Sequence, residues 1–312
     1  MDELKVFTGN AHPTLAREIC DYLGIPLGKA DVFEFSNENI FVRILENVRQ
    51  RDVFVIQPIC SPVNKSLVEL LIMIDAFRRA SAGRVTAVIP YYAYGRTDKK
   101  DQPRVPITAR LIADLITTAG ANRLLTVDLH APQIQGFFTI PVDELTAFSI
   151  LSQYFKEKAL SNLVVVATDI GISKRARDVA ASLGSPLAII EKRRLGNTDT
   201  SETTNIIGEV QGMRILTVDD EIDTAGSLIG AANSLMERGA TEIYSCCIHP
   251  VFSGLALQKI ASSPIKEVVV VDTIPVTNDK KLDKITVLPI ASLIGEAIHR
   301  IHTGLSIGAM FE

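Results

Sequence analysis

Acidic residues are concentrated at one point in the C-terminal half of the chain. Asp219, Asp220, Glu221 and Asp223 lie within five consecutive positions. They follow residues 215–218, an apolar and β-branched run that predicts a buried parallel strand. Because ligands of α/β sheets bind at the carboxyl ends of strands, these acids stand where a ligand site is expected.

Small residues follow the acids directly. Thr224, Ala225, Gly226 and Ser227 precede an apolar-periodic segment that predicts a helix ending at Arg238. Backbone N–H groups at a helix start, with hydroxyl groups beside them, form a cradle for a phosphate group. We therefore interpret this stretch as a sugar-phosphate site.

The carboxylates need a separate role, because negative charge beside the cradle would repel a phosphate. Sugar hydroxyls and a metal ion are both suitable partners for them. The alternative is a plain strand-to-helix connection, in which Asp220 or Asp223 caps the helix and the other acids face water.

Two polar segments carry basic residues that could contact a nucleotide. Residues 91–106 include Arg96 and three further cations, and they predict a projecting loop. Residues 191–194, Glu-Lys-Arg-Arg, precede the polar, aperiodic stretch 195–204. This second pattern predicts a mobile loop whose cations could close over a phosphoryl group in transfer. For each segment, a charged loop that only faces solvent is the alternative.

Two more polar residues follow predicted strands. His130 comes after strand 123–127, and Asp169 comes after strand 163–167. His130 could be a metal ligand or a hydrogen-bonded loop residue, and Asp169 could cap a helix beginning at Ser173. The chain has no Walker A motif, so any bound ATP is not held by a P-loop.

The surrounding elements alternate between strands and helices. This alternation, with apolar strands, predicts an α/β fold with a doubly wound, mainly parallel sheet. In the first half, strands are expected at 4–8, 53–57, 84–90 and 123–127, helices at 14–23, 66–80 and 107–119, and a hairpin from strands 32–35 and 40–44.

The second half of the chain repeats the first. With an offset of 160 positions, residues 6–27 and 166–187 are identical in type at eight positions. We therefore predict two tandem, duplicated domains, at residues 1–145 and 146–312. The first copy of the acidic strand ends in residues 57–61, Gln-Pro-Ile-Cys-Ser, which lack carboxylates, so a single sugar site is expected.

Composition excludes several classes of function. The chain has 312 residues, 47% of them hydrophobic, and a formal net charge of −4, so no bulk attraction to nucleic acid or anionic membranes is expected. Neither a signal-peptide pattern nor a membrane-spanning run is present. The four cysteines show no zinc spacing and fit reduced structural thiols, which indicates a cytoplasmic protein.

Taken together, these stretches resemble ribose-phosphate pyrophosphokinase, also called phosphoribosyl pyrophosphate synthetase. The resemblance extends from residue 6 to residue 311. Its most specific strings are residues 69–76, 86–92, 128–138 and 218–227. It implies two phosphoribosyltransferase-type, Rossmann-like domains and the transfer of the β,γ-pyrophosphoryl group of ATP to the 1-hydroxyl of ribose 5-phosphate.

The resemblance also assigns roles to residues. Lys192 and Arg194 would be the catalytic cations, and His130 and Asp169 would organise Mg²⁺. It further implies a homohexamer that responds to phosphate and ADP. Contacts to ATP would come from Phe35, Asn37, Glu38, Asn39, Arg96 and Thr97, and contacts to ribose 5-phosphate from Arg194, Asp219, Asp220, Asp223, Thr224, Ala225, Gly226 and Ser227.

Some positions depart from the usual family pattern. Asn39 replaces a carboxylate at the adenine amino group, and Thr97 replaces Gln. Because an amide both accepts and donates, looser nucleotide selectivity is expected. Ile172 replaces a glycine, which matters if that position requires a positive φ. Lys65 replaces an acidic residue.

Two other functions use the same features. A phosphoribosyltransferase would bind phosphoribosyl pyrophosphate in the same cradle, but the duplicated domain, Arg96 and the Lys192/Arg194 pair argue against it. A non-catalytic regulatory paralogue is the other alternative, and the intact Lys192, Arg194, His130 and Asp220 argue against that.

Overall fold

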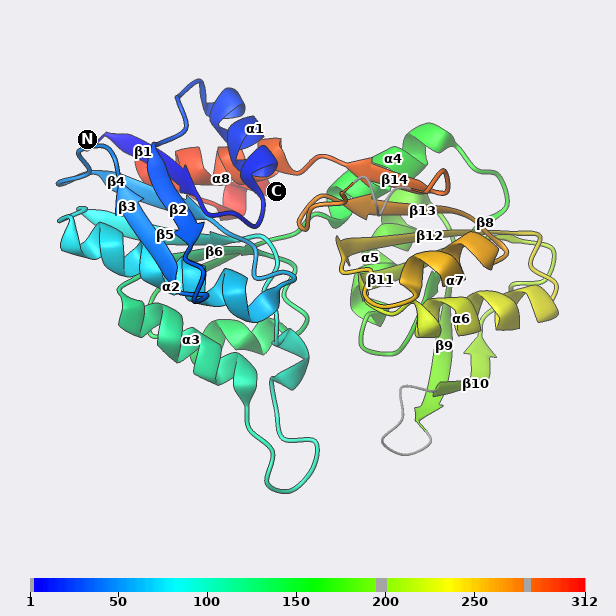
Figure 1. Cartoon of the computed structure of the whole chain (residues 1–312). Helices are drawn as coiled ribbons and strands as arrows, with labels where there is room; N and C mark the ends of the chain where they lie inside the picture. Colours follow the sequence, from blue (N-terminus) through cyan, green and yellow to red (C-terminus); the bar gives the residue numbers. More distant parts are fainter. Residues whose placement is uncertain (1–2, 195–200, 278–281, 312) are drawn as a thin grey trace. The chain divides into compact units, whose positions relative to one another are not determined.

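The chain folds into two compact units (Figure 1). The computed structural model describes residues 3–194, 201–277 and 282–311, and of residues 192–194 and 201–204 it describes the backbone alone. Unit 1 comprises Met1–Thr146, Thr273–Pro275 and Ile290–Glu312, and unit 2 comprises Ala147–Asp272 and Val276–Pro289.

Unit 1 is built on a parallel sheet with strand order β1-β4-β5-β6-β7. All five residues of β4 are buried, as expected for a strand covered on both faces. Helices α2 and α3 pack on one face, and α1 and α8 lie on the other (Figure 1). The strands are β1 (Leu4–Thr8), β4 (Asp52–Ile56), β5 (Arg84–Ile89), β6 (Arg123–Val127) and β7 (Val142–Leu145); the helices are α1 (Pro13–Leu23), α2 (Val63–Arg79), α3 (Thr108–Ala119) and α8 (Ala291–Thr303).

A separate hairpin and short 3₁₀ turns complete unit 1. β2 (Ala30–Glu34) and β3 (Ile40–Ile44) pair antiparallel as their own sheet, which confirms the predicted hairpin. The 3₁₀ turns are η1 (Gly95–Thr97), η2 (Pro132–Phe137) and η4 (Gly308–Met310).

Unit 2 contains a larger sheet with strand order β10-β9-β8-β11-β12-β13-β14. Only the β9–β10 pair is antiparallel in this sheet as described. Its core joins the strands to α6 and α7 on one face. The strands are β8 (Leu163–Ala167), β9 (Leu187–Arg194), β10 (Ser201–Ile207), β11 (Arg214–Ile222), β12 (Glu242–Pro250), β13 (Ile265–Val271) and β14 (Ile285–Leu288); the helices are α4 (Phe148–Lys158), α5 (Ser173–Leu183), α6 (Gly226–Glu237) and α7 (Ala256–Ser262).

The two sheets share one topology. The order β8-β11-β12-β13-β14 repeats β1-β4-β5-β6-β7. Each unit also has an antiparallel hairpin at the same place in the chain: β2–β3 lies between α1 and β4, and β9–β10 lies between α5 and β11. In unit 1 the hairpin is a separate sheet, and in unit 2 it extends the main sheet beside β8. This correspondence agrees with the predicted duplication.

The last helix belongs to unit 1, so the units differ from a simple division of the chain after residue 145. α8 packs on α1, where Gly295 makes room for Tyr22: a Cβ at residue 295 would lie 2.4 Å from the Tyr22 Cδ1 atom. Arg84 also fastens α8, because its guanidinium bonds both the Asp52 carboxylate and the carbonyl of Ile301, the latter at 3.1 Å. The helix that follows the last strand of unit 1 likewise belongs to the other unit: α4 follows β7 but packs on α5 of unit 2.

The prediction of a loop over residues 191–204 is wrong for the residues of that stretch whose backbone the structure describes. Residues 191–194 and 201–204, expected in a mobile loop, lie in the β9–β10 hairpin, where Lys192 pairs with Thr203 and Arg194 with Ser201. Their polar sequence hid the strands, because an antiparallel pair at the edge of a sheet needs no apolar periodicity. Residues 195–200 lie outside the described part of the chain.

Candidate functional site

The acidic stretch begins inside strand β11, which runs to Ile222 and is longer than predicted. In the sheet, Val218 pairs with Ala167 of β8 and Asp219 pairs with Cys247 of β12. The acids therefore lie at the edge where the neighbouring parallel strand β8 also ends.

Asp219 is turned toward the protein. Its Oδ2 accepts a hydrogen bond of 2.7 Å from the Thr168 hydroxyl, and its Oδ1 accepts one of 3.0 Å from the Asp220 N–H. Burial raises the pKa of the Asp219 carboxyl well above its usual range, and the negative charge of Asp220 raises it further. Asp219 thus supports the site, and Asp220 follows it toward the strand end.

The segment after β12 braces the turn that carries Asp223. The Ser253 hydroxyl donates to the Asp223 carboxylate, and the Ser253 N–H donates to the Asp223 carbonyl at 3.1 Å. One residue earlier, the Phe252 N–H donates to the Ile222 carbonyl at 3.0 Å. These bonds fix the turn between β11 and α6 before any ligand binds.

The predicted cradle lies at the N-terminus of α6. Ala225, the residue before the helix, has φ 59° and ψ 7°, in the left-handed region, and Gly226 begins the helix. A left-handed residue next to helical ones turns successive N–H groups to one side and forms an anion-binding nest. In the described chain no side chain caps this helix, so its first N–H groups can face a ligand.

Lys259 of α7 is a neighbour of the cradle that the sequence did not reveal. Its ammonium donates to the Thr224 carbonyl at 3.1 Å, although 35 positions separate the two residues. Only the packing of α7 beside α6 brings them together, so sequence spacing carried no signal.

Asp169 occupies an exposed position at the end of β8. Its Oδ1 accepts the Ile172 N–H at 3.1 Å, which closes the loop that leads into α5. Ile172 has φ −84°, so this loop needs no glycine there and the substitution fits. Lys174 and Arg175 lie in the first turn of α5 and were also missed; their place directly after the Asp169 loop was the available signal.

The predicted catalytic cations can be located only by their backbone. Lys192 and Arg194 lie at the carboxyl end of β9, but their side chains are outside the described part of the structure. β9 runs parallel to β8, so this end lies at the same sheet edge as Asp169.

In unit 1, the predicted adenine turn is a well-formed hairpin loop. The Phe35 N–H donates to the Asn39 carbonyl at 2.8 Å, and Asn37 Oδ1 accepts the Asn39 N–H at 3.2 Å. Glu38 has φ 66° in this turn. Phe35 is 48% exposed, so its ring offers a surface on which a base could stack.

The loop before α3 lies against the end of β6. A Cβ on Gly95 would be 3.3 Å from the Cβ of His130, which places η1, with Arg96 and Thr97, beside His130. The Thr97 hydroxyl donates to the Tyr94 carbonyl at 2.7 Å. The residues predicted for ATP and metal in unit 1 thus include one close group, Arg96, Thr97 and His130.

The strand end of unit 1 that corresponds to the cradle is filled by protein. Glu69, only 2% exposed, accepts hydrogen bonds from the Asn10 N–H at 2.6 Å and from Gln57 Nε2 at 2.8 Å. A buried carboxylate at this place would repel a phosphate. A single sugar-phosphate site stays a prediction, and this buried carboxylate favours it.

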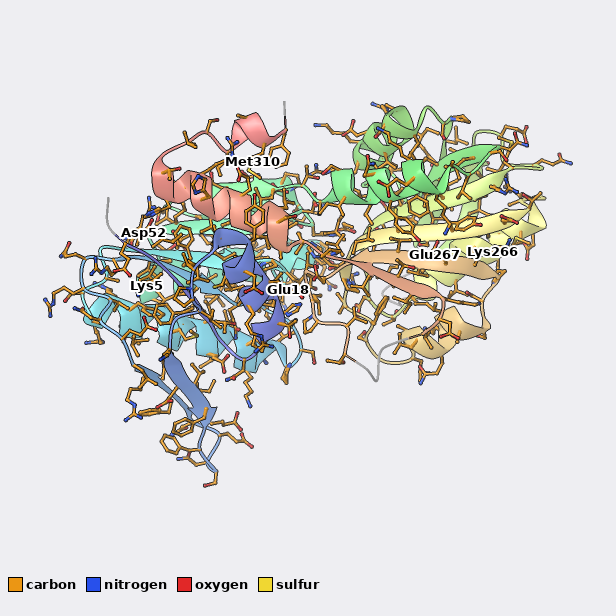
Figure 2. The ribbon with its side chains drawn as sticks, turned by 90° about the horizontal axis from the view of Figure 1, so that it is seen from above. Lys5, Glu18, Asp52, Lys266, Glu267 and Met310 are labelled. Atoms are coloured by element: carbon orange, nitrogen blue, oxygen red, sulfur yellow. The ribbon has the colours of Figure 1, made fainter. Side chains whose placement is uncertain are left out.

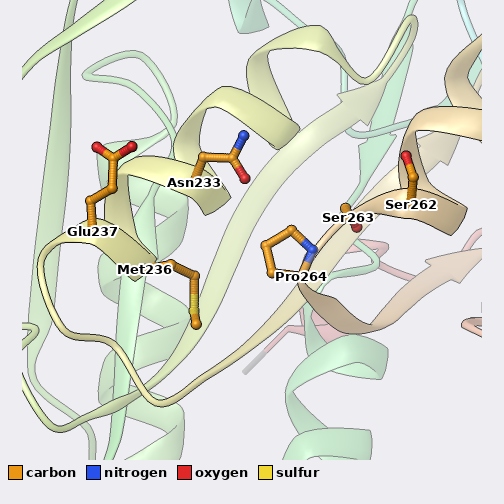
Figure 3. Close-up of a pocket in the computed structure, with 6 residues that line it drawn as sticks. All are labelled: Asn233, Met236, Glu237, Ser262, Ser263 and Pro264. Carbon is orange, nitrogen blue, oxygen red and sulfur yellow. The ribbon is translucent and has the colours of Figure 1, made fainter.

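Three further features concern the described residues as a whole. No group of three or more His, Cys, Asp or Glu side chains within them is placed to hold a metal ion. None of the described helices is long and apolar enough to cross a membrane. A pocket of about 530 Å³ lies at the end of α6 remote from the cradle (Figure 3); it is lined by Asn233, Met236, Glu237, Ser262, Ser263 and Pro264.

Comparisons with known proteins agree over the whole chain. A family model for the N-terminal domain of ribose phosphate pyrophosphokinase matches residues 4–120, and one for the phosphoribosyl synthetase-associated domain matches residues 197–312. Ribose-phosphate pyrophosphokinase of Caldanaerobacter subterraneus subsp. tengcongensis is 55% identical, with 99% of this chain and 98% of the relative covered. That of Clostridium acetobutylicum is 52% identical, with 99% and 97% covered. The crystal structure of phosphoribosylpyrophosphate synthetase from Mycobacterium smegmatis superposes with a TM-score of 0.91 at 42% identity, covering 97% of this chain and 100% of that one.

Proposed function

The chain belongs to the ribose-phosphate pyrophosphokinase family, and from this premise we propose how its residues divide the reaction among them. It is a transferase of nucleotide biosynthesis that moves the β,γ-pyrophosphoryl group of ATP to the 1-hydroxyl of ribose 5-phosphate. The products are phosphoribosyl pyrophosphate and AMP.

The acceptor sugar binds at the junction of β11 and α6. The 5-phosphate lies on the nest formed by Ala225 and the uncapped start of α6, and this feature carries the proposal. Asp220 and Asp223 hold ribose hydroxyls, while Asp219, bonded to Thr168, holds the strand end in place.

The transferring group meets cations from the β9–β10 hairpin. Lys192 and Arg194 stabilise the charge on the pyrophosphoryl group and on the departing AMP. The parallel pairing of β9 with β8 supports this role, since it brings their backbone to the sheet edge that carries Asp169. Lys174, in the first turn of α5, adds positive charge at the same edge.

ATP is recognised by the hairpin turn and the η1 loop. Phe35 stacks on the adenine, the Asn37–Asn39 turn reads its edge, and Arg96 and Thr97 contact the nucleotide from η1. Asn39 offers both an acceptor and a donor, so selectivity for ATP is relaxed relative to a carboxylate at that position.

Mg²⁺ is the expected cofactor, and it would neutralise and clamp the ATP phosphates. The exposed carboxylate of Asp169 fits a hard cation that prefers oxygen ligands, since its bond to Ile172 leaves further lone pairs. The exposed imidazole of His130 fits Mg²⁺ less well, so it serves ATP phosphates or metal-bound water instead. The enzyme works as a cytoplasmic homo-oligomer that phosphate and ADP regulate.

The test is a label-transfer assay. Ribose 5-phosphate, Mg²⁺ and ATP labelled with ³²P at the γ-phosphate should yield AMP and labelled phosphoribosyl pyrophosphate in equal amounts. Release of labelled inorganic phosphate with ADP, or no AMP at all, would overturn the proposed reaction.

A further inference from the structure

The ammonium of Lys259 lies beside the start of α6. Its Nζ is 3.1 Å from the Thr224 carbonyl oxygen and 3.9 Å from the position that a Cβ on Gly226 would take. Both neighbours belong to the predicted phosphate cradle. A positive charge therefore stands at the place where the helix presents its N–H groups.

The position of Lys259 is fixed by the fold. Lys259 lies on α7, whose N-terminal approach is braced by the bonds between Ser253 and Asp223. At the other end, the Lys284 ammonium bonds the carbonyls of Ala261 at 3.1 Å and Ser263 at 2.8 Å. α7 is held at both ends, and Lys259 is partly buried. The Lys259 ammonium is therefore already positioned beside the cradle before a ligand binds.

The charge balance of the cradle calls for a cation. Asp220, Glu221 and Asp223 immediately precede the cradle, and a sugar phosphate brings about two more negative charges. The helix N-terminus supplies the equivalent of only about half a positive charge. An ammonium has three N–H donors, and the Thr224 carbonyl uses one of them.

We propose that Lys259 is a binding and specificity residue for the acceptor, donating to the 5-phosphate of ribose 5-phosphate while it holds the Thr224 carbonyl in the cradle. Its ligand class is a phosphate monoester dianion, so it favours phosphorylated over unphosphorylated ribose. This inference rests on the proposed acceptor role of the cradle.

The test compares two substitutions that separate charge from bracing. Lys259→Gln can still donate a hydrogen bond to Thr224 but has no charge, and Lys259→Arg keeps the charge. The loss of one charge-assisted bond to phosphate predicts that Lys259→Gln raises KM for ribose 5-phosphate about 10- to 100-fold. KM for ATP should stay within about twofold, and Lys259→Arg should recover most of the affinity.

The matched control is Lys266→Gln. Lys266, labelled in Figure 2, lies in unit 2 near the start of β13, where it ion-pairs with Glu242 at the amino end of β12. This variant should leave both KM values unchanged. Thermal unfolding of all three variants shows whether each is folded.

Direct binding separates this inference from the proposed reaction. Calorimetry with ribose 5-phosphate and with ribose needs no turnover. Lys259→Gln should weaken the binding of ribose 5-phosphate and leave that of ribose unchanged. A folded Lys259→Gln protein that binds ribose 5-phosphate like the wild type would overturn the inference, whereas a wild type that binds the sugar phosphate but forms no AMP would overturn the reaction alone.

Discussion

At the scale of single residues, the sequence predicted that the acids lie at a strand end and the small residues at a helix start, and the structure confirms both positions. Their roles toward a ligand stay predictions. Residue types and spacing could not show that Asp219 bonds Thr168, since that contact spans 51 positions. The left-handed Ala225 was equally hidden, because alanine seldom adopts that conformation.

Asp219→Asn should make stability less dependent on pH. The raised pKa means that the fold favours the protonated carboxyl, so wild-type stability is undiminished below the unfolded pKa of about 3.9 and falls as pH rises through the folded pKa. The amide can still accept from Thr168 but cannot ionise. Urea unfolding of the ligand-free protein should therefore show an advantage of the variant that grows with pH, and an advantage that is constant with pH would contradict this reading.

Asn39→Glu should sharpen nucleotide selectivity without a folding cost. The backbone bonds of the hairpin turn use the carbonyl and N–H of residue 39 and leave its side chain uninvolved. A restored carboxylate would accept from the adenine amino group and reject the carbonyl of guanine, which predicts roughly a tenfold gain in the ratio of kcat/KM for ATP over GTP. An unchanged ratio removes Asn39 from the adenine site.

At the scale of elements, apolar periodicity was a reliable guide and polarity was not. The predicted strands and helices of the first half match β1 to β6 and α1 to α3 within a few residues, because each buries an apolar face or stripe. The β9–β10 hairpin was missed, because strands at the edge of a sheet can be built from Lys, Arg, Glu and Thr. The polar link between α2 and the N-terminal hairpin was also invisible: Asn10, bonded to Glu69, donates to the Val32 carbonyl of β2 at 3.1 Å.

Glu69→Gln should destabilise unit 1. The Glu69 carboxylate accepts from two donors of Asn10 and one of Gln57, and an amide would turn its own N–H₂ toward donors. The amide oxygen can replace Oε1 for the Asn10 N–H and Gln57, so the bond that is lost is the one from the Asn10 side-chain amide to Oε2, which predicts a loss of about 1–3 kcal/mol in the free energy of unfolding. Exposed Glu18, labelled in Figure 2, gives the control Glu18→Gln, which should change it by less than about 0.5 kcal/mol. Equal effects of the two variants would show that the buried network contributes nothing.

At the scale of the whole molecule, the sequence revealed the duplication but not which unit each of the helices α4 and α8 belongs to. Identities at an offset of 160 positions reflect two copies with the same strand order. α8 belongs to unit 1 because it packs on α1, with Gly295 against Tyr22. No local sequence pattern predicts a contact between residues so far apart in the chain. The consequence is that the first unit is complete only when the last helix has been made.

Gly295→Ala should report on that packing. The added Cβ would lie 2.4 Å from the Tyr22 ring, so either the ring or the helix must shift. Overpacking of this kind predicts a loss of about 1–3 kcal/mol in the free energy of unfolding. In a Tyr22→Ala background the same substitution should cost much less, and a double-mutant cycle without coupling would contradict the contact.

The central claim is that acceptor binding and phosphoryl transfer are carried by different parts of unit 2, the β11–α6 cradle and the β9–β10 hairpin. Lys192→Ala tests it most directly, with turnover measured by AMP formation and ribose 5-phosphate affinity by calorimetry. We expect turnover to fall by more than about a hundredfold while the dissociation constant changes by less than about threefold. Persistent turnover, or loss of sugar-phosphate binding together with activity, would contradict the account.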